Sequence, residues 1–278
     1  MSDSTAATSD VPHQAASLQE LLDLRGEVAL VTGAGQGVGA TVARYLSAQG
    51  AAVAVNDFRL ERAEEVAAKI RAEGGSALAF QADVTDFAAV QAMVGEVAER
   101  LGPVSVLVNN AGNAGAGTSV PDGRPFWESD PADWEPFLAV NLNGVLNCSR
   151  AVVPAMVESR HGRLITVISD AGRVGEAGME AYSAAKAGAA GLMRSLARSL
   201  GRHQITANCV AIGFTNTPAV AQAVENPELS RKVLGAYIIR RVGEPSDAAG
   251  MVTYLASRAG SWITGQTYPV NGGFSVNQ

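Results

Sequence analysis

Residues 32–39 read TGAGQGVG and lie between a short apolar run and a helical pattern. This order predicts a buried strand, a tight turn and a helix. Gly33, Gly37 and Gly39 place no side chain in front of the turn, so its backbone amides and the N-terminus of the helix can bind a pyrophosphate. The spacing Gly-x-x-x-Gly-x-Gly differs from the common Gly-x-Gly-x-x-Gly fingerprint. The turn therefore predicts a nucleotide-binding unit of a specific type.

Apolar runs that predict strands alternate with helical patterns along the chain. The runs lie at residues 28–32, 51–56, 77–82, 104–109, 164–168, 206–211 and 266–270, and the main helical patterns at 41–49, 60–73, 87–101, 134–160, 182–202 and 246–256. Such alternation is typical of a parallel sheet, and 278 residues can bury one on both faces. We expect an α/β fold: a single doubly wound, Rossmann-type domain with a seven-stranded parallel sheet and helices on both faces.

Two irregular stretches interrupt this alternation, at residues 113–133 and 213–241. Both are expected to border a substrate cleft, because ligands bind at the carboxyl ends of the strands in such sheets. Residues 1–24 form a polar extension that we expect to be largely disordered, with one short helix predicted by the capping-box spacing at 17–20. Residues 25–278 then form the single dinucleotide-binding and catalytic domain.

The composition excludes several classes of protein. The net charge is −6 and no stretch combines basic clusters with aromatic residues, so nucleic acid is not an expected partner. No apolar run is long enough to cross a membrane, and the polar start of the chain lacks the features of a presequence. Cys148 and Cys209 lie in separate apolar segments, which predicts reduced thiols and a cytoplasmic protein. The three histidines have no ligand spacing, so no metal site is expected.

A second motif, Tyr182-x-x-x-Lys186, carries the chemistry. Residues four apart share a face of a helix, so the Lys186 ammonium can lie beside the Tyr182 phenol. Moving the pKa of a tyrosine from about 10 to near 7 takes roughly 4 kcal/mol, and one charge at about 4 Å supplies about that much at an effective dielectric near 20. The pair alone is common on helices, but here the glycine turn and Ser169 precede it in a consistent order. That combination indicates a hydride-transfer enzyme with a tyrosine acid/base.

Asp57 ends the second predicted strand. A carboxylate there can accept hydrogen bonds from both hydroxyls of an adenosine ribose, and it would repel a 2′-phosphate. We therefore expect NAD rather than NADP as the cofactor. Arg59 could soften this preference, although a solvated arginine at a helix start is the simpler interpretation.

These motifs together resemble those of the short-chain dehydrogenase/reductase family, in its compact single-domain branch. The resemblance extends from about residue 24 to residue 274. It rests on Gly33-x-x-x-Gly37-x-Gly39, Asp83-Val84, Asn109-Asn110-Ala111-Gly112, Val140-Asn141-Leu142-x-Gly144, Ser169, Tyr182-x-x-x-Lys186, and Ile263-Thr264-Gly265-Gln266 to Gly272-Gly273. It implies a nicotinamide-dependent oxidoreductase and a homotetramer. One departure is Ile212-Gly213, where the family usually has Pro-Gly and a more rigid turn.

The resemblance also implies the catalytic residues. Ser169 would bind the substrate oxygen, and Tyr182 would transfer the proton. Lys186 would lower the pKa of the tyrosine and bind the nicotinamide ribose, while Asn141 would hold a water that links this lysine to solvent.

The implied cofactor site involves residues from five loops. Asp83 and Val84 would contact the adenine, Asn109 would brace the sheet beside the cofactor, and Thr217 would hold the nicotinamide carboxamide. The full set of expected contacts is Gly33, Gln36, Gly37, Val38, Gly39, Asp57, Asp83, Val84, Asn109, Ala111, Gly112, Tyr182, Lys186, Gly213 and Thr217.

The segment at residues 169–175 resembles that of alicyclic hydroxyacyl-CoA dehydrogenases, such as those acting on 2-hydroxycyclohexanecarboxyl-CoA. In that interpretation Arg173 meets an acyl thioester carbonyl or a carboxylate, and Trp127, with Phe126 and Trp134, covers an apolar ring or chain. The alternatives are a solvated arginine and ordinary packing aromatics. Because no basic cluster for a CoA phosphate is evident in the sequence, a free cyclic or aliphatic alcohol or ketone stays open as the substrate.

We therefore expect an NAD(P)-dependent oxidoreductase that interconverts a secondary alcohol and a ketone. A 3-oxoacyl thioester reductase and a non-catalytic, cofactor-sensing protein are the alternatives. The second would typically have lost Ser169, Tyr182 or Lys186, and all three are present. A nucleotide-sugar epimerase is disfavoured, because it needs a larger C-terminal domain and Gly-x-x-Gly spacing, whereas position 36 is Gln.

Overall fold

A computed structural model describes residues 16–112, 125–218 and 220–276, and it has one seven-stranded sheet. The strands are β1 (Val28–Val31), β2 (Ala52–Asp57), β3 (Ser76–Gln81), β4 (Val106–Asn109), β5 (Gly162–Ser169), β6 (Ile205–Ile212) and β7 (Thr267–Val270). Every pairing between neighbouring strands is parallel. The predicted seven-stranded parallel sheet is confirmed.

The strand order is β3-β2-β1-β4-β5-β6-β7, so the chain reverses its direction of travel between β1 and β4. Crevices form at such a switch point, beyond the carboxyl ends of the strands, because the loops after the two strands turn away from each other. The glycine turn follows β1, and residues 110–112 follow β4. The topology therefore brings these two segments to the same crevice.

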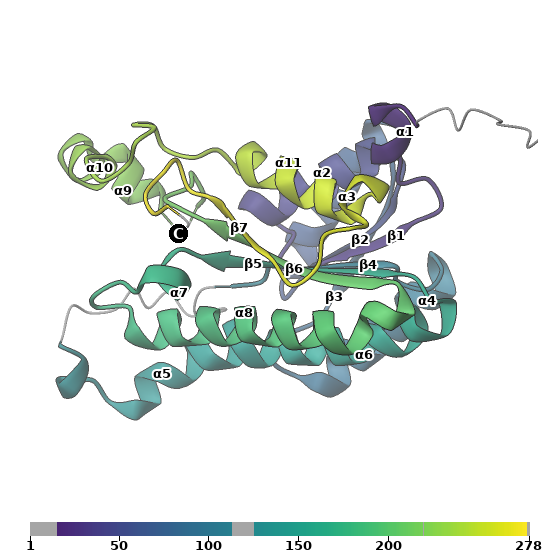
Figure 1. Ribbon diagram of the computed structural model, residues 1–278, viewed down its shortest axis with the longest axis horizontal. Coiled ribbons are helices and arrows are strands. Elements are labelled where there is room, and N and C mark those ends of the chain that lie inside the picture. Colours follow the sequence, from purple (N-terminus) through teal and green to yellow (C-terminus); the bar gives the residue numbers. More distant parts are fainter. Residues whose placement is uncertain (1–15, 113–124, 219, 277–278) are drawn as a thin grey trace, which may run out of the picture.

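Helices cover both faces of the sheet (Figure 1). They are α1 (Leu18–Leu22), α2 (Gly37–Ala48), α3 (Leu60–Ala72), α4 (Phe87–Arg100), α5 (Pro131–Leu138), α6 (Gly144–Ser159), α7 (Ala171–Val174), α8 (Glu180–Leu200), α9 (Ala221–Glu225), α10 (Pro227–Leu234) and α11 (Pro245–Ala256). Alternate strand residues enter two separate cores, so that Leu30 packs with α4, α6 and α8 while Val31 packs with α2, α3 and α11. Burial on both faces explains why the strands read as continuous apolar runs.

The predicted helix at 134–160 is interrupted in the structure. It consists of α5, one π-helical turn (Ala139–Asn143) and α6. A π turn inserts one extra residue into a helix, and such turns are frequent at functional sites. This one contains Asn141.

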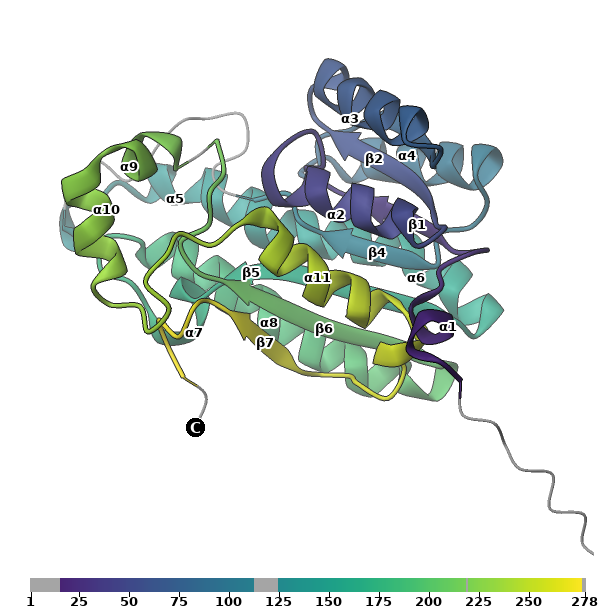
Figure 2. The ribbon, with the colours of Figure 1, turned by 90° about the horizontal axis from the view of Figure 1, so that it is seen from above.

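The region 213–241 is less irregular than expected, because it contains α9 and α10. Both helices are short and are separated by Asn226 alone, and α10 begins with Pro227, so their apolar periodicity is too brief to recognise. Figure 2 shows them beyond the carboxyl ends of β5 and β6, on the same side as α7. Of the other irregular stretch, residues 113–124 lie outside the described residues, and a 3-10 turn (Phe126–Glu128) precedes α5.

The predicted short helix near the start of the chain is present as α1. The Ser17 hydroxyl accepts from the amide of Glu20, and the Glu20 carboxylate accepts from the amide of Ser17, which is a capping box. The disorder expected before it concerns residues 1–15, which lie outside the described residues. None of the described helices has the length and apolarity needed to cross a bilayer.

Candidate active site

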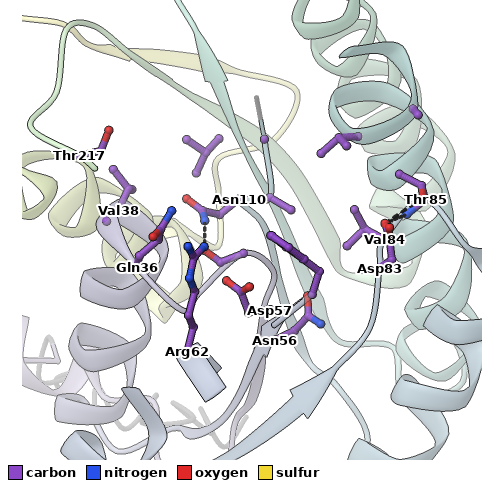
Figure 3. A pocket seen from close by; sticks show the side chains of 18 of the residues that line it. Gln36, Val38, Asn56, Asp57, Arg62, Asp83, Val84, Thr85, Asn110 and Thr217 are labelled. Carbon is purple, nitrogen blue, oxygen red and sulfur yellow. Dashed lines mark hydrogen bonds between the residues drawn. The ribbon is translucent and has the colours of Figure 1, made fainter. Parts of the chain in front are cut away.

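A cavity of about 560 Å³ lies at the carboxyl ends of β1, β2 and β4 and extends to α8. This volume is in the range of small-molecule and cofactor sites. Figure 3 shows side chains that line it. Its wall consists of Gly33, Gln36, Gly37, Val38, Asn56, Asp57, Phe58, Arg62, Ala82, Asp83, Val84, Thr85, Asn110, Ala111, Gly112, Pro136, Ala139, Val140, Val167, Ile168, Tyr182, Lys186, Ile212, Thr217 and Pro218.

The glycine turn is held against the loop after β4. The Asn110 side-chain amide donates to the carbonyls of Thr32 and Gly33, at 2.9 and 3.0 Å. Gly33 has φ +60°, and a Cβ at this position would lie 2.8 Å from the Cα of Ala111. Only glycine accommodates that contact and that backbone conformation. The close approach leaves the turn open for a phosphate group and supports the fit of a dinucleotide.

The carboxylate of Asp57 is buried at one end of the cavity. It accepts from the backbone amides of Gly35 (3.2 Å) and Arg59 (3.0 Å). Arg62, from the first turn of α3, extends into the same end of the cavity beside Gln36 (Figure 3). The sequence analysis missed Arg62, although its place five residues after Asp57, at the start of a helix, was a usable signal.

Polar contacts also fix the loop after β3. The Asp83 carboxylate accepts from the Thr85 amide (2.9 Å) and hydroxyl (2.8 Å). Asn147 of α6 donates to the carbonyls of Val84 (2.9 Å) and Thr85 (3.2 Å). Asp83 and Val84 thus line the cavity from a loop tied to the helix layer. Sequence reasoning did not identify Thr85 or the supporting Asn147.

Three proposed catalytic side chains meet where β5 faces α8. Ser169 ends β5, and Tyr182 and Lys186 lie one turn apart on α8. The Lys186 ammonium is 5.8 Å from the centre of the Tyr182 ring and donates to the carbonyl of Val167 at 3.0 Å. A hydrogen bond with Ser169 lowers the pKa of Tyr182. The predicted shared face and the predicted Ser169–Tyr182 proximity are therefore present.

Asn141 lies in the π turn and is fully buried. Its side-chain amide donates to the carbonyl of Phe137 at 2.9 Å. Its Oδ1 and the Lys186 Nζ each lie 3.3 Å from where a Cβ of Gly112 would stand. Asn141 and Lys186 are thus neighbours beside the loop after β4.

Comparisons with known proteins agree with this geometry. A family model described as "Enoyl-(Acyl carrier protein) reductase" matches residues 33–275. The chain is 38% identical to the (2S)-[(R)-hydroxy(phenyl)methyl]succinyl-CoA dehydrogenase subunit BbsD of Thauera aromatica, over 92% of this chain and 99% of that protein. This protein belongs to the short-chain dehydrogenase/reductase family. It is accordingly an oxidoreductase that uses a nicotinamide cofactor.

Two further relatives show the breadth of this short-chain dehydrogenase/reductase family. The 3-oxoacyl-[acyl-carrier-protein] reductase FabG of Staphylococcus aureus is 39% identical over 88% of this chain and 96% of that protein. The crystal structure of a gluconate 5-dehydrogenase from Burkholderia cenocepacia, in complex with NADP and tartrate, has 32% identity and a TM-score of 0.85, covering 93% of this chain and 99% of that one.

Burial opposes the expected activation of the tyrosine. The pKa of Tyr182 is raised above its ordinary value, mainly because the phenol is buried and also because of the negative charge of Glu176, while the hydrogen bond with Ser169 lowers it. Burial likewise lowers the pKa of Lys186 to about 8. The net shift of the Tyr182 pKa is therefore upward, opposite to the expected lowering, because desolvation of the phenolate outweighs the hydrogen bond with Ser169.

Three expected cofactor contacts do not form part of the cavity wall in the described structure. Asn109 is buried and donates to the hydroxyls of Ser149 (3.4 Å) and Thr166 (3.3 Å), so it braces the sheet as expected. A Cβ on Gly39 would lie 2.3 Å from the Asn110 side chain, so this glycine permits the turn to close. Gly213 donates from its amide to the carbonyl of Val270 (3.3 Å), and the following loop reaches the cavity through Thr217.

The two expected substrate residues are placed differently from the interpretation that named them. Arg173 is mostly buried and pairs with the Asp170 carboxylate at 2.5 Å, so its charge is already matched. Trp127 is 82% exposed, and its neighbour Phe126 stacks on Trp134 with ring centres 5.1 Å apart. Neither Arg173 nor Trp127 belongs to the wall of the described cavity. Arg173 is therefore not the solvated arginine of the alternative interpretation, and the packing alternative fits Phe126 and Trp134 but not the exposed Trp127.

Proposed function

We propose that Tyr182, assisted by Ser169, Lys186 and Asn141, is the acid/base of an enzyme that interconverts a secondary alcohol and a ketone with NAD(H). The observation that carries this proposal is that Tyr182 and Lys186 line the cavity together, while Ser169 at the end of β5 makes a hydrogen bond with Tyr182. A general acid/base must lie within hydrogen-bond reach of the reacting oxygen. The Ser169 hydroxyl and the Tyr182 phenol, which already interact, can share one substrate oxygen.

Different residues of the chain bind the cofactor, orient the substrate and transfer the proton. The glycine turn would bind the pyrophosphate of the cofactor, and Asp57 would bind its adenosine ribose. Thr217 and Lys186 would hold the nicotinamide end. The bound cofactor supplies or accepts the hydride. Ser169 orients the substrate oxygen, and the Tyr182 phenol gives it a proton or takes one. Lys186 places a positive charge near the phenol, and Asn141 stands beside that ammonium, where a water could carry the proton towards solvent.

A spectrophotometric screen tests this function. Absorbance at 340 nm is followed with NAD or NADP and hydroxyacyl thioesters, cyclic alcohols or aliphatic secondary alcohols, and in reverse with NADH or NADPH and the matching ketones. We expect NAD-linked turnover of at least one class. No turnover of any class in either direction would contradict the proposal.

Thioesters are the first substrates to test. Two curated relatives, at 38% and 39% identity, bear the names of a succinyl-CoA dehydrogenase subunit and a 3-oxoacyl-carrier-protein reductase. Arg231, Lys232 and Arg240 are exposed on α10 and in the loop after it, beyond the carboxyl ends of the strands (Figure 2). They offer positive charge that the sequence analysis did not recognise as a group. A 3-oxoacyl thioester reductase is therefore the second candidate.

The choice between NAD and NADP depends on two side chains of opposite charge, Asp57 and Arg62. The buried carboxylate favours ribose hydroxyls over a 2′-phosphate, whereas the guanidinium in the same end of the cavity favours the phosphate. We expect the Asp57→Ala variant to gain NADP-linked kcat/KM and lose NAD-linked kcat/KM, each by about tenfold or more, a change on the order of 1.4 kcal/mol. Arg62→Ala is the matched variant and should shift the preference towards NAD. An unchanged ratio in Asp57→Ala would contradict the NAD assignment.

We also propose a homotetramer in the cytoplasm. Helices α6 and α8 lie side by side on one face of the sheet (Figure 1), and Leu146 of α6 is 43% exposed there, which supports an interface. Cys148 and Cys209 are both buried and unpaired, as in proteins of reducing compartments. Light scattering gives the molecular mass in solution, and a monomer would contradict the tetramer.

A further inference from the structure

The chain ends in a turn that its own hydrogen bonds stabilise. After β7, the Asn271 side-chain oxygen accepts from the amide of Gly273 (3.0 Å), and its backbone carbonyl accepts from the amide of Phe274 (3.0 Å). The Asn271 side-chain amide also donates to the Ser275 carbonyl at 2.9 Å. Asn271 is buried. Residues 271–275, which we term the C-terminal turn, thus have a defined shape.

One side of the C-terminal turn holds the segment from Asp170 to Arg173, which directly follows Ser169 at the end of β5. The Asn271 side-chain amide donates to Asp170 Oδ2 at 2.5 Å, and Arg173 donates to the Ser275 hydroxyl at 2.7 Å and to Asp170 Oδ1 at 2.5 Å. The Asp170 side chain is only 3% exposed. Charge-assisted hydrogen bonds of this kind are among the strongest in proteins. The carboxylate next to Ser169 is therefore held by Arg173, three residues away, and by Asn271, 101 residues away in sequence.

The other side of the C-terminal turn contacts the segment between α10 and α11, which in turn holds the loop after β6. The Gly272 carbonyl accepts from the amide of Ile239 at 2.8 Å, and the Phe274 ring lies against the Tyr237 ring with centres 5.1 Å apart. The Tyr237 hydroxyl in turn accepts from the amide of Phe214 at 2.7 Å. Phe214 lies in the loop that leads to Thr217 at the cavity.

On this side, the backbone of the C-terminal turn lies so close to residues 237–239 that position 273 requires glycine. Gly273 has φ +78°, and a Cβ there would lie 2.8 Å from the Cβ of Ile238. A larger residue would be strained and would push the two segments apart. The backbone itself is therefore built to bring the C-terminal turn against residues 237–239.

We propose that the C-terminal turn is a positioning element that fixes both the Ser169 loop and the loop after β6 relative to Tyr182. The inference rests on the proposed function, because it matters for catalysis only if Ser169 binds the substrate oxygen. Helix α7, which follows Ser169, has four residues, and so short a helix does not hold its own shape in water. The turn adds a constraint to the packing of α7 against α8, where Gly172 lies against Lys186, and Arg173 acts through Asp170 and Ser275 rather than on the substrate.

Steady-state kinetics of Asn271→Ala and Ser275→Ala test the catalytic consequence. We expect kcat to fall about tenfold or more, since small misplacements of reacting groups cost this much, while the dissociation constant for NADH, measured by fluorescence, stays close to wild type. The Tm of Asn271→Ala should fall, because the buried Asp170 carboxylate loses a hydrogen bond. Ser275→Thr, which keeps the hydroxyl, should restore kcat, and Ser199→Ala at the far end of α8 is the matched control. Wild-type kcat in both alanine variants would overturn the proposal.

A double-mutant cycle separates the two roles of Arg173. If Arg173 acts through the turn, the effects of Arg173→Met and Ser275→Ala on kcat are strongly less than additive, because both remove the same constraint. If Arg173 binds the substrate directly, Arg173→Met raises KM for anionic substrates alone and its effect adds to that of Ser275→Ala. The second result would overturn the assignment of Arg173.

Hydrogen exchange tests, without any substrate, whether the contacts of the C-terminal turn hold the two neighbouring segments in place. We expect the amides of residues 170–175 and of Phe214 to exchange faster in Asn271→Ala and Phe274→Ala than in wild type, while those of β1 stay protected. Unchanged exchange would overturn the proposal even in an active enzyme. Faster exchange in a protein that turns over no substrate would instead contradict the proposed function and leave the mechanical role of the turn supported.

Discussion

Replacing Tyr182 with phenylalanine is expected to lower kcat by about 10² to 10⁴, the usual contribution of a positioned acid/base. The substitution removes only the hydroxyl that interacts with Ser169. The ring stays in place, because its edge-to-face contact with Phe137, at 6.3 Å between centres, does not involve the hydroxyl. Binding of NADH, measured by fluorescence titration, should therefore change little.

The matched control is Tyr254→Phe. Tyr254 lies on α11 and is partly exposed, away from the cavity wall, so its loss should affect neither kcat nor cofactor binding. If Tyr182→Phe turned over substrate at the wild-type rate, Tyr182 would not be the acid/base. If it lost both turnover and NADH binding, the hydroxyl would have a structural role instead.

Replacing Lys186 with methionine is expected to abolish turnover and to stabilise the protein at neutral pH. Burial lowers the pKa of Lys186 from 10.5 to about 8, which means that the folded state disfavours the charged form. A shift of this size corresponds to about 3 kcal/mol at pH 7, at 1.36 kcal/mol per pKa unit. Methionine fills a similar volume without a charge, so the free energy of unfolding should rise by up to about this amount, less the lost hydrogen bond to Val167.

The pH dependence of the free energy of unfolding tests whether the buried charge of Lys186 is the cause of the expected stabilisation. Between about pH 8 and 10.5 the unfolded chain keeps a proton that the folded Lys186 has lost, so the wild-type free energy of unfolding should rise with pH in this window. This rise should be absent in Lys186→Met and present in Lys69→Met, whose lysine lies exposed on α3. Urea unfolding at pH 7, 8, 9 and 10 measures it. A wild-type stability that fell through the same window would contradict the assigned sign.

Much of the fold could be predicted because its signals are local. The strands are buried on both faces, so they read as apolar runs, and their boundaries agree with the structure to within about two residues. Helices α9 and α10 were missed because each spans too few residues for a periodic pattern. The π turn at Asn141 was missed because one extra residue in a helix leaves no compositional trace.

The residues of the candidate site also divide into those that the sequence predicts and those that only the structure reveals. Asp57, Tyr182 and Lys186 were identifiable because their motifs have fixed spacings and they line one cavity. Arg62 was not identified, although its place five residues after Asp57 was a usable signal, and the packing of α3 beside β2 turns it into the end of the cavity that holds Asp57. For Arg173, sequence position suggested a substrate contact, whereas the structure pairs it with Asp170 and with Ser275, a residue 102 positions away.

The sequence by itself therefore determined the fold class, the glycine turn and the candidate catalytic residues, because local periodicity and motif spacing encode them. Only the tertiary structure decided the directions of the pKa shifts of Tyr182 and Lys186 and the partners of Arg173. Burial sets the two pKa values, and burial depends on every element packed around α8 rather than on neighbours in sequence. One partner of Arg173, Ser275, comes from the far end of the chain, and only the folding of β7 beside β6 brings it to Arg173.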